Sequence, residues 1–327
     1  MSYYYYVDTD VLDNLSVVRK VYGSSPNDHG PDMAFVKGGG WTDLEVASPF
    51  KVDFHDEVVE MTDGAAVHAD DIGGLRFNTD SVNVSNPLLN PVETVGKRFA
   101  WFYTYYDCKV VFRNMRKDLP LSLDGYLTDE QQALFFKGGN PPHGWNGIEM
   151  YCLLNDINRR FAEWYADAMY LILGDIYKSY CSDAQCHIID YRKSGFMDGL
   201  SKEAMLVMEP EQFAARMEET VPESGLPELF QEYAKEMEAA YAEEISLLDR
   251  FPYAFVYSMS MPGRYIGGNA PDFIDGIPVW KVDGYRLLYD DVVMEAEFRK
   301  ANLWAFLLTF AAIALLLQVF SKMFARR

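Results

Sequence analysis

Hydrophobic and polar positions alternate over short segments at both ends of the chain, which predicts β-strands there. The longest such segment, residues 98–113, has one mostly apolar face at its even positions and aromatic side chains at its odd positions up to Tyr105. We expect it to be a single strand with one buried and one half-covered face. The predicted strands are residues 3–7, 15–22, 41–46, 50–54, 57–61, 98–113, 253–261, 264–266, 277–282 and 285–298.

Between these strands, apolar residues recur every three or four positions, which predicts helices. The longest helix is expected at residues 147–180, with a buried stripe that includes Ile148, Tyr151 and Phe161. The other predicted helices are a short one that opens at Thr128, residues 184–208 with breaks at Gly195 and Gly199, residues 209–220, and one that begins at Pro227.

The order of strands, helices and strands predicts an α+β fold. Because either set of strands alone would leave a bare face and open edges, we expect one antiparallel or mixed sheet built from N- and C-terminal strands, with the helices as a central insertion that covers it. Turn signals after residue 261 predict that the closing strands form a meander. The expected soluble domain is residues 1–302, with strands in 1–115, the helical insertion in 125–250 and closing strands in 253–298.

Residues 303–320 predict one C-terminal transmembrane helix. They carry no charge, and at 1.5 Å per residue they cover about 27 Å, close to the hydrocarbon thickness of a bilayer. The alternative, a buried core helix, lacks support because the segment has no polar stripe. The expected anchor residues are Leu303, Trp304 and Phe320 at the interfaces and Lys322, Arg326 and Arg327 in the short basic tail, residues 321–327.

The side of the membrane on which the domain lies is left open by the charges. The cations near the helix are Arg286, Arg299 and Lys300 before it and Lys322, Arg326 and Arg327 after it. This near tie gives no orientation by the positive-inside rule. The first residues lack the basic and apolar regions of a signal peptide, which predicts a tail anchor facing the cytoplasm. If a signal segment is missing from this sequence, the domain is instead periplasmic or otherwise extracytoplasmic.

Composition narrows the classes of partner. The net charge is −20, and the part before the apolar helix carries −23 because three of the basic residues follow the helix. An acidic surface repels nucleic acid and anionic headgroups, so neither is expected as a partner. Aromatic residues make up 15% of the chain, which predicts aromatic-rich strands or an apolar cavity.

Sites with catalytic or metal-binding chemistry are not indicated. No nucleophile, dinucleotide or kinase motif is present, so we expect no enzyme and no cofactor. Asp8, Asp10 and Asp13 lack the spacing of a calcium loop and indicate a turn instead. Cys181 and Cys186 lack a second pair of ligands for zinc, and in an oxidising compartment they could form a local disulfide.

The C-terminal strands carry a resemblance. Met261-Pro262-Gly263, Asn269 and Val279-Trp280, followed by the single helix, resemble the closing strands of the LppM-type domain of bacterial envelope lipoproteins. Residues 86–112 and 146–149 are similar to uncharacterised envelope proteins of Bacteroides-type bacteria. The resemblance implies an export signal with a lipid-modified cysteine, an envelope location and, for the LppM type, a cavity that takes glycolipid. This N-terminus contains neither the signal nor the cysteine.

Two hypotheses of function follow. In the first, the membrane-anchored domain binds a lipid or another amphiphile between its aromatic sheet and its helices, with Trp101, Tyr103, Tyr105 and Trp164 as lining residues. The simpler alternative for each of these side chains is a place in the core. In the second, the chain is a scaffold that presents its acidic helices to another protein, such as an envelope protein. A hydrolase is the least favoured class.

Overall fold

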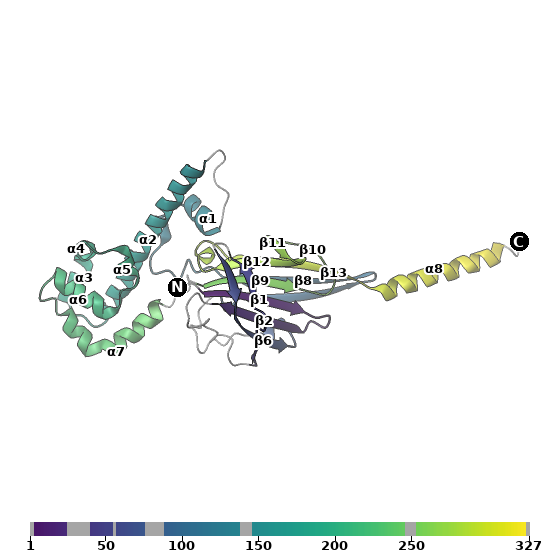
Figure 1. Ribbon diagram of the computed structural model, residues 1–327, viewed down its shortest axis with the longest axis horizontal. Helices are drawn as coiled ribbons and strands as arrows, with labels where there is room; N and C mark the ends of the chain where they lie inside the picture. Colours follow the sequence, from purple (N-terminus) through teal and green to yellow (C-terminus); the bar gives the residue numbers. More distant parts are fainter. Residues whose placement is uncertain are drawn as a thin grey trace. The chain divides into compact units, whose positions relative to one another are not determined.

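A computed structural model describes residues 3–24, 40–54, 57–75, 88–137, 146–245 and 253–324. The chain forms two compact units (Figure 1). The sheet unit comprises Met1–Arg113, Pro252–Gly284 and Asp291–Arg327, and the helical unit comprises Asn114–Phe251 and Tyr285–Asp290. The predicted α+β class is confirmed, with strands from both ends of the chain and helices between them.

The larger sheet joins the two ends of the chain. Its seven strands lie in the order β11-β12-β9-β1-β2-β6-β3, and β1 pairs in parallel with β9 while the other pairs are antiparallel. The strands are β1 (Tyr3–Val11), β2 (Val17–Ser24), β3 (Thr42–Asp43), β6 (Asp63–Ala69), β9 (Tyr253–Ser260), β11 (Asp272–Ile274) and β12 (Ile277–Asp283). The expected hairpin near the N-terminus is the β1–β2 pair.

The smaller sheet has four strands in the order β10-β13-β8-β7. They are β7 (Val92–Ala100), β8 (Tyr103–Phe112), β10 (Arg264–Gly268) and β13 (Val292–Ala301). The strands therefore form two separate main sheets rather than the one sheet expected from the sequence. Two further predictions are wrong. Residues 98–113 are not one strand, because the chain turns at Trp101 and Phe102. The closing strands are not a meander, because β9 and β12 belong to the larger sheet and β10 and β13 to the smaller one.

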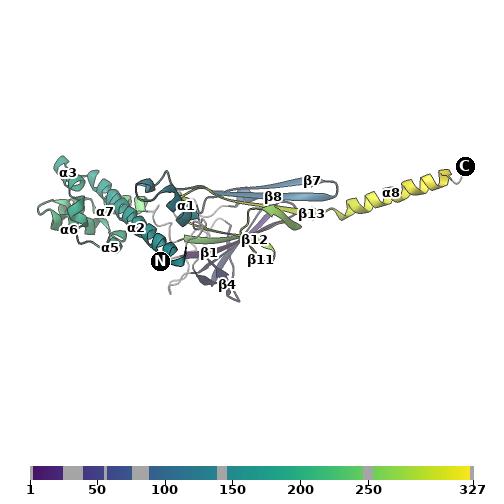
Figure 2. The same cartoon turned by 90° about the horizontal axis from the view of Figure 1, so that it is seen from above.

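The two sheets pack face to face, and their facing sides form the core (Figure 2). Every second residue of β8 from Thr104 to Phe112 is buried, as the alternation predicts. The ring of Phe112 contacts that of Tyr257 on β9 at 5.1 Å between centroids. The far face of the larger sheet is covered by a small hairpin, β4 (Phe50–Asp53) and β5 (Val58–Met61), whose Val52 and Met61 are buried against Val256.

A buried ion pair bridges the sheets. The Arg19 guanidinium donates two hydrogen bonds to the Glu93 carboxylate, at 2.6 and 3.0 Å, and a third to the Thr9 hydroxyl at 3.0 Å. Only 3% of the Arg19 side chain and 8% of the Glu93 side chain are exposed. Burial is the largest single effect and lowers the pKa of Arg19, but the charge and the hydrogen bonds of Glu93, with smaller contributions from other groups, together outweigh it, so the net pKa is raised and the arginine stays charged.

Cys108 lies in the same core, and burial raises the pKa of its thiol to about 12. At pH 8 only about one molecule in 10,000 would carry the reactive thiolate there. We expect a thiol reagent to modify the exposed Cys152 and to leave Cys108 unmodified until urea unfolds the chain. Mass spectrometry of labelled peptides checks this, and equal labelling of both residues in native buffer would contradict the burial of Cys108.

The helical unit is built around one long helix, α2 (Gly147–Lys178), which begins with the capping box of Asn146 and Glu149. Its stripe is core from Ile157 onward, but Ile148 and Tyr151 are 75% and 69% exposed, so their predicted burial is wrong. The remaining helices are α1 (Asp129–Lys137), α3 (Asp183–Tyr191), α4 (Lys193–Met197), α5 (Lys202–Leu206), α6 (Pro210–Thr220) and α7 (Leu226–Ile245).

Helix α8 (Leu303–Phe324) confirms the predicted C-terminal helix. The most apolar 18-residue window within Leu303–Met323 has a mean hydropathy of 2.3, and the helix is long and apolar enough to span a membrane. Strand β13 ends at Ala301, so Asn302 alone separates the smaller sheet from this helix. With this single residue as the joint, α8 follows directly on the last strand of the smaller sheet.

Candidate membrane interface

Asn302 ties the start of α8 to the turn between β7 and β8, which we call the hairpin tip (residues 99–103). Its side-chain amide donates to the Ala100 carbonyl at 3.0 Å, and its side-chain oxygen accepts from the Thr104 hydroxyl at 2.9 Å. Its backbone N–H donates to the Phe102 carbonyl, and its own carbonyl accepts from Ala305. The side chain is 9% exposed, so these bonds replace water at a buried site.

Aromatic side chains of the hairpin tip pack on the first turns of α8. The Trp101 indole donates to the Thr309 hydroxyl at 2.9 Å and meets the Trp304 ring edge-on at 5.3 Å. The Phe99 ring stacks parallel to that of Trp304, at 6.2 Å between centroids. Trp101, Phe99 and Trp304 are each about half exposed, in the manner of side chains that sit between an apolar and a polar layer.

Cations lie over the next aromatic rings. The Arg299 guanidinium is 4.5 Å from the centre of the Tyr103 ring, and the Arg98 guanidinium is 4.4 Å from that of Tyr105. Tyr103 also contacts Phe306 of α8, at 5.8 Å. The tyrosine faces therefore hold guanidinium groups beside the start of the apolar helix.

Asp13, in the β1–β2 turn, lies beside two lysines that are close in sequence to the hairpin tip and to α8. Its carboxylate accepts a hydrogen bond from the Tyr106 hydroxyl and lies 3.2 Å from the Lys300 amine and 3.7 Å from that of Lys97. The Tyr106 hydrogen bond and the two lysines lower the pKa of Asp13. The stability that the folded chain gains from the lowered pKa of Asp13 is present above the unfolded pKa of this carboxyl and is lost as the pH falls through the lowered pKa. Because the side chain is 59% exposed, solvent screens it.

Three of the four residues proposed to line an amphiphile site come together here. Trp101, Tyr103 and Tyr105 follow one another along the hairpin tip and β8. Trp164 belongs to the helical unit, where it is fully buried and donates to the Leu121 carbonyl at 2.9 Å. The indole N–H of Trp164 therefore has its hydrogen-bond acceptor within the helical unit.

The other predicted residues have the following places. Leu303 and Trp304 form the first turn of α8, and Phe320 and Lys322 lie exposed in its last turns, whereas Arg326 and Arg327 lie outside the described residues.

Asp8 and Asp10 belong to β1 and accept hydrogen bonds from Ser258 and Ser260 of β9. Cys181 and Cys186 are free thiols in this structure. Sequence reasoning missed Asn302, whose only signal is its position between a strand and an apolar helix.

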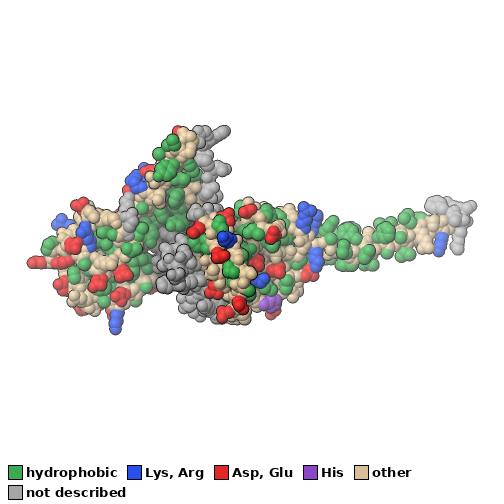
Figure 3. Space-filling model, viewed as in Figure 1, with side chains coloured by type: hydrophobic (Ala, Val, Ile, Leu, Met, Phe, Trp, Pro, Cys, Tyr) green, Lys and Arg blue, Asp and Glu red, His purple; other side chains and the backbone are tan. Residues whose placement is uncertain are grey.

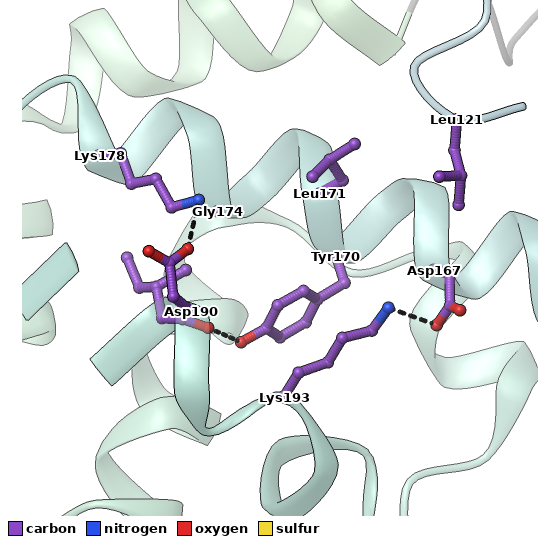
Figure 4. A pocket seen from close by; sticks show the side chains of 9 residues that line it. Leu121, Asp167, Tyr170, Leu171, Gly174, Lys178, Asp190 and Lys193 are labelled. Carbon is purple, nitrogen blue, oxygen red and sulfur yellow. Dashed lines mark hydrogen bonds and ion pairs between the residues drawn. The ribbon is translucent and has the colours of Figure 1, made fainter. Parts of the chain in front are cut away.

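The helical unit contains a pocket of about 180 Å³ (Figure 4). Lys193 pairs with Asp167 at 2.8 Å on one side, and Lys178 pairs with Asp190 at 2.7 Å on the other. The Tyr170 hydroxyl donates to a backbone carbonyl at 2.6 Å. The charged groups of the pocket are thus paired with one another, and they link α2 to α3 and α4.

The Asn302 contacts can be tested directly. Asn302→Ala removes the side-chain amide and leaves the Thr104 hydroxyl and the Ala100 carbonyl without this partner, at a cost of about 1–3 kcal/mol. We expect faster amide hydrogen exchange in residues 99–105 of the detergent-solubilised chain. Thr94→Ala, which removes an exposed hydroxyl from the same sheet, should leave that exchange unchanged. Equal exchange in both variants would show that Asn302 does not hold the joint.

Neither the family models nor the curated protein sequences compared with this chain give a match. Among solved structures, the chain is similar to the folded domain of LppM from Mycobacterium tuberculosis, with a TM-score of 0.28 and 7% sequence identity over 92% of this chain and 91% of that one. A TM-score this low carries no argument about function. The LppM-type resemblance therefore has a weak structural counterpart, and the Bacteroides-type resemblance has no support.

Proposed function

We propose that this chain is a single-pass membrane protein whose sheet unit rests against the bilayer and binds lipid there through the hairpin tip. The observation that carries the proposal is the packing of Trp101 and Phe99 on Trp304, at the start of an apolar helix. Indole rings favour the boundary between hydrocarbon and headgroups. Helix residues 303–323 span about 32 Å, enough to cross the hydrocarbon layer from that boundary.

The proposal changes the position of the amphiphile relative to the first hypothesis. Trp101, Tyr103 and Tyr105 contact bilayer lipids beside α8 rather than a ligand between a sheet and helices. The half-exposed faces of Phe99 and Trp101 are the surfaces available for acyl chains and glycerol groups. Trp164 is not part of this surface because it is fully buried in the helical unit.

Photo-crosslinking tests the proposal. A benzoylphenylalanine at position 99 of the full chain in proteoliposomes should crosslink to phospholipid. The matched control is position 92, which is also exposed but lies at the far end of the same strand. Lipid adducts at 99 and none at 92 are expected. Adducts to neither position, or to both equally, would contradict a membrane-facing hairpin tip.

The scaffold hypothesis is the second candidate, and one observation favours it. Ile148 and Tyr151 expose 75% and 69% of their surface on the first turns of α2, in the acidic helical unit. Exposed apolar side chains of this kind occur at protein interfaces. A benzoylphenylalanine at position 151 should then crosslink to a protein in intact cells, while one at the exposed position 160 of the same helix should not. Absence of a protein adduct at 151 would count against the scaffold.

A further inference from the structure

We infer that three arginines on the outer face of the smaller sheet bind the phosphate groups of anionic lipids in the bilayer. We call Arg98, Arg264 and Arg299 the arginine row. The inference deepens the proposed function and rests on it, because it requires the hairpin tip to lie at the bilayer. It names the class of lipid, one that carries a net negative headgroup.

The register of the sheet aligns these arginines. Arg264 of β10 pairs with Arg299 of β13, Arg299 pairs with Tyr105 of β8, and Tyr105 pairs with Arg98 of β7. Residues paired across neighbouring strands point to the same face of a sheet. The three arginines and Tyr105 therefore form one line across all four strands, on the face opposite the buried Thr104 and Tyr106.

None of the three guanidinium groups has a carboxylate within 4 Å among the residues that the structure describes. All three side chains are exposed. Neighbouring lysines differ, since Lys97 and Lys300 share Asp13 and Lys109 pairs with Glu295. Like charges placed side by side on a sheet repel one another and destabilise the folded chain. An anionic ligand bound between the arginines would remove this repulsion.

The side chains are held in a suitable orientation. Arg299 is paired with Tyr105, yet its guanidinium lies over Tyr103, one position closer to the hairpin tip on the same face. It therefore leans toward the start of α8. A guanidinium that stacks on a ring keeps its N–H groups in the plane of the fork, where they can donate to two phosphate oxygens at once.

The arginine row also lies at a suitable depth. Arg299 is four residues before the first residue of α8, so its Cα is about 13 Å from that point along the strand. The headgroup layer extends about 5–8 Å beyond the hydrocarbon. A long side chain that leans toward the bilayer covers the remaining distance. Figure 3 shows basic side chains gathered where the sheet unit meets the apolar helix.

The net charge of the whole chain is −20, but this value does not describe the local charge at the arginine row. Charges farther away than about 8–10 Å are largely screened at physiological salt, so the bilayer interacts mainly with the groups nearest to it. Glu297 and Asp107 are the acids of the next line on the same face, two residues farther from α8 along their strands. These two carboxylates weaken the attraction between the arginine row and an anionic headgroup. Binding therefore depends more on bidentate contacts between the guanidinium groups and phosphate than on net charge.

Lipid-selective quenching tests the inference. The full chain is reconstituted in phosphatidylcholine vesicles that contain brominated phosphatidylglycerol or brominated phosphatidylcholine, and the part of the tryptophan quenching that is lost in Trp101→Phe gives the relative association of the two lipids with the hairpin tip. We expect a preference of about fivefold for phosphatidylglycerol. The triple variant Arg98→Gln, Arg264→Gln, Arg299→Gln should reduce it to less than twofold. Lys51→Gln, an exposed cation on β4, should leave it unchanged.

The outcomes separate the two proposals. Quenching by both lipids to the same extent in the wild type, or an unchanged preference in the triple variant, overturns the arginine row while the hairpin tip remains at the bilayer. Quenching by neither lipid overturns the proposed function as well. Arg98→Lys with Arg299→Lys should keep part of the preference, because lysine retains the charge without the planar fork. Circular dichroism spectra that match the wild type confirm that the variants fold.

Discussion

Glu93→Gln is expected to lower the free energy of unfolding of the sheet unit by about 3–5 kcal/mol. The amide keeps the shape of the carboxylate but leaves the Arg19 guanidinium charged and 3% exposed in the core between the sheets. The Thr9 hydroxyl and the oxygen of the introduced amide remain as hydrogen-bond acceptors for the guanidinium, and neither carries a charge. A buried charge without a counter-charge is among the costliest defects that one substitution can produce.

Urea unfolding of the detergent-solubilised chain, followed by near-ultraviolet circular dichroism, measures this loss. Glu295→Gln is the matched control, because it breaks an exposed ion pair with Lys109 and should cost less than about 1 kcal/mol. The double variant Arg19→Met, Glu93→Leu should recover most of the stability, since it removes both charges. If Glu93→Gln and Glu295→Gln have the same effect, the ion pair is not buried between the sheets.

Gly263→Ala is expected to detach β10 from β13 at a cost of about 3 kcal/mol or more. Gly263 has a φ of +102°, a conformation that side chains rarely allow. A Cβ there would lie 2.3 Å from the Arg299 carbonyl oxygen and 2.7 Å from the Lys300 nitrogen. Both are backbone atoms of the strand that leads into α8, so no rotation of a side chain relieves the clash.

Amide hydrogen exchange of β10 and β13 shows whether this pairing is lost. Gly267→Ala provides the control in the same strand, since a Cβ at that position meets no atom within 4 Å. We expect faster exchange across residues 264–268 and 296–300 in Gly263→Ala and a pattern close to the wild type in Gly267→Ala. Equal protection in the two variants would contradict the close approach of the turn to β13.

The motif that carries the LppM-type resemblance has a structural role here. Asn269 accepts from the Trp280 indole at 2.9 Å and from the Glu295 backbone at 2.8 Å, and it donates to the Val293 carbonyl at 2.7 Å. It thereby joins β12 of the larger sheet to β13 of the smaller one. Together with Gly263, it explains why these residue types occur in the segment where the chain crosses between the sheets.

The parts of the fold that depend on local pattern were predictable. The alternation in β8, the capping box of α2 and the apolar run of α8 each act within one element. The turn at Trp101 and Phe102 was not, because it has no glycine, proline or asparagine, and the aromatic residues around it favour strands. Its stability comes from contacts with α8, which no local pattern contains.

The candidate site was predictable only in part for the same reason. Trp101, Tyr103 and Tyr105 are conspicuous in the sequence, and the structure brings them together beside α8. The arginine row depends on the register between three segments that are far apart in the chain. An excess of aromatic residues does not distinguish a ring in a cavity from one in a core, so it could not show that Trp164 is fully buried in the helical unit.

In the proposed function, the hairpin tip lies at the bilayer boundary beside α8. Phosphatidylcholines brominated at different positions along the acyl chain test this position, through the part of the tryptophan quenching that is lost in Trp101→Phe. We expect that part to be strongest for bromine near the headgroup end of the chain and weak for bromine near the terminal methyl. Quenching that does not change in Trp101→Phe at any depth would place the hairpin tip in water and contradict the account.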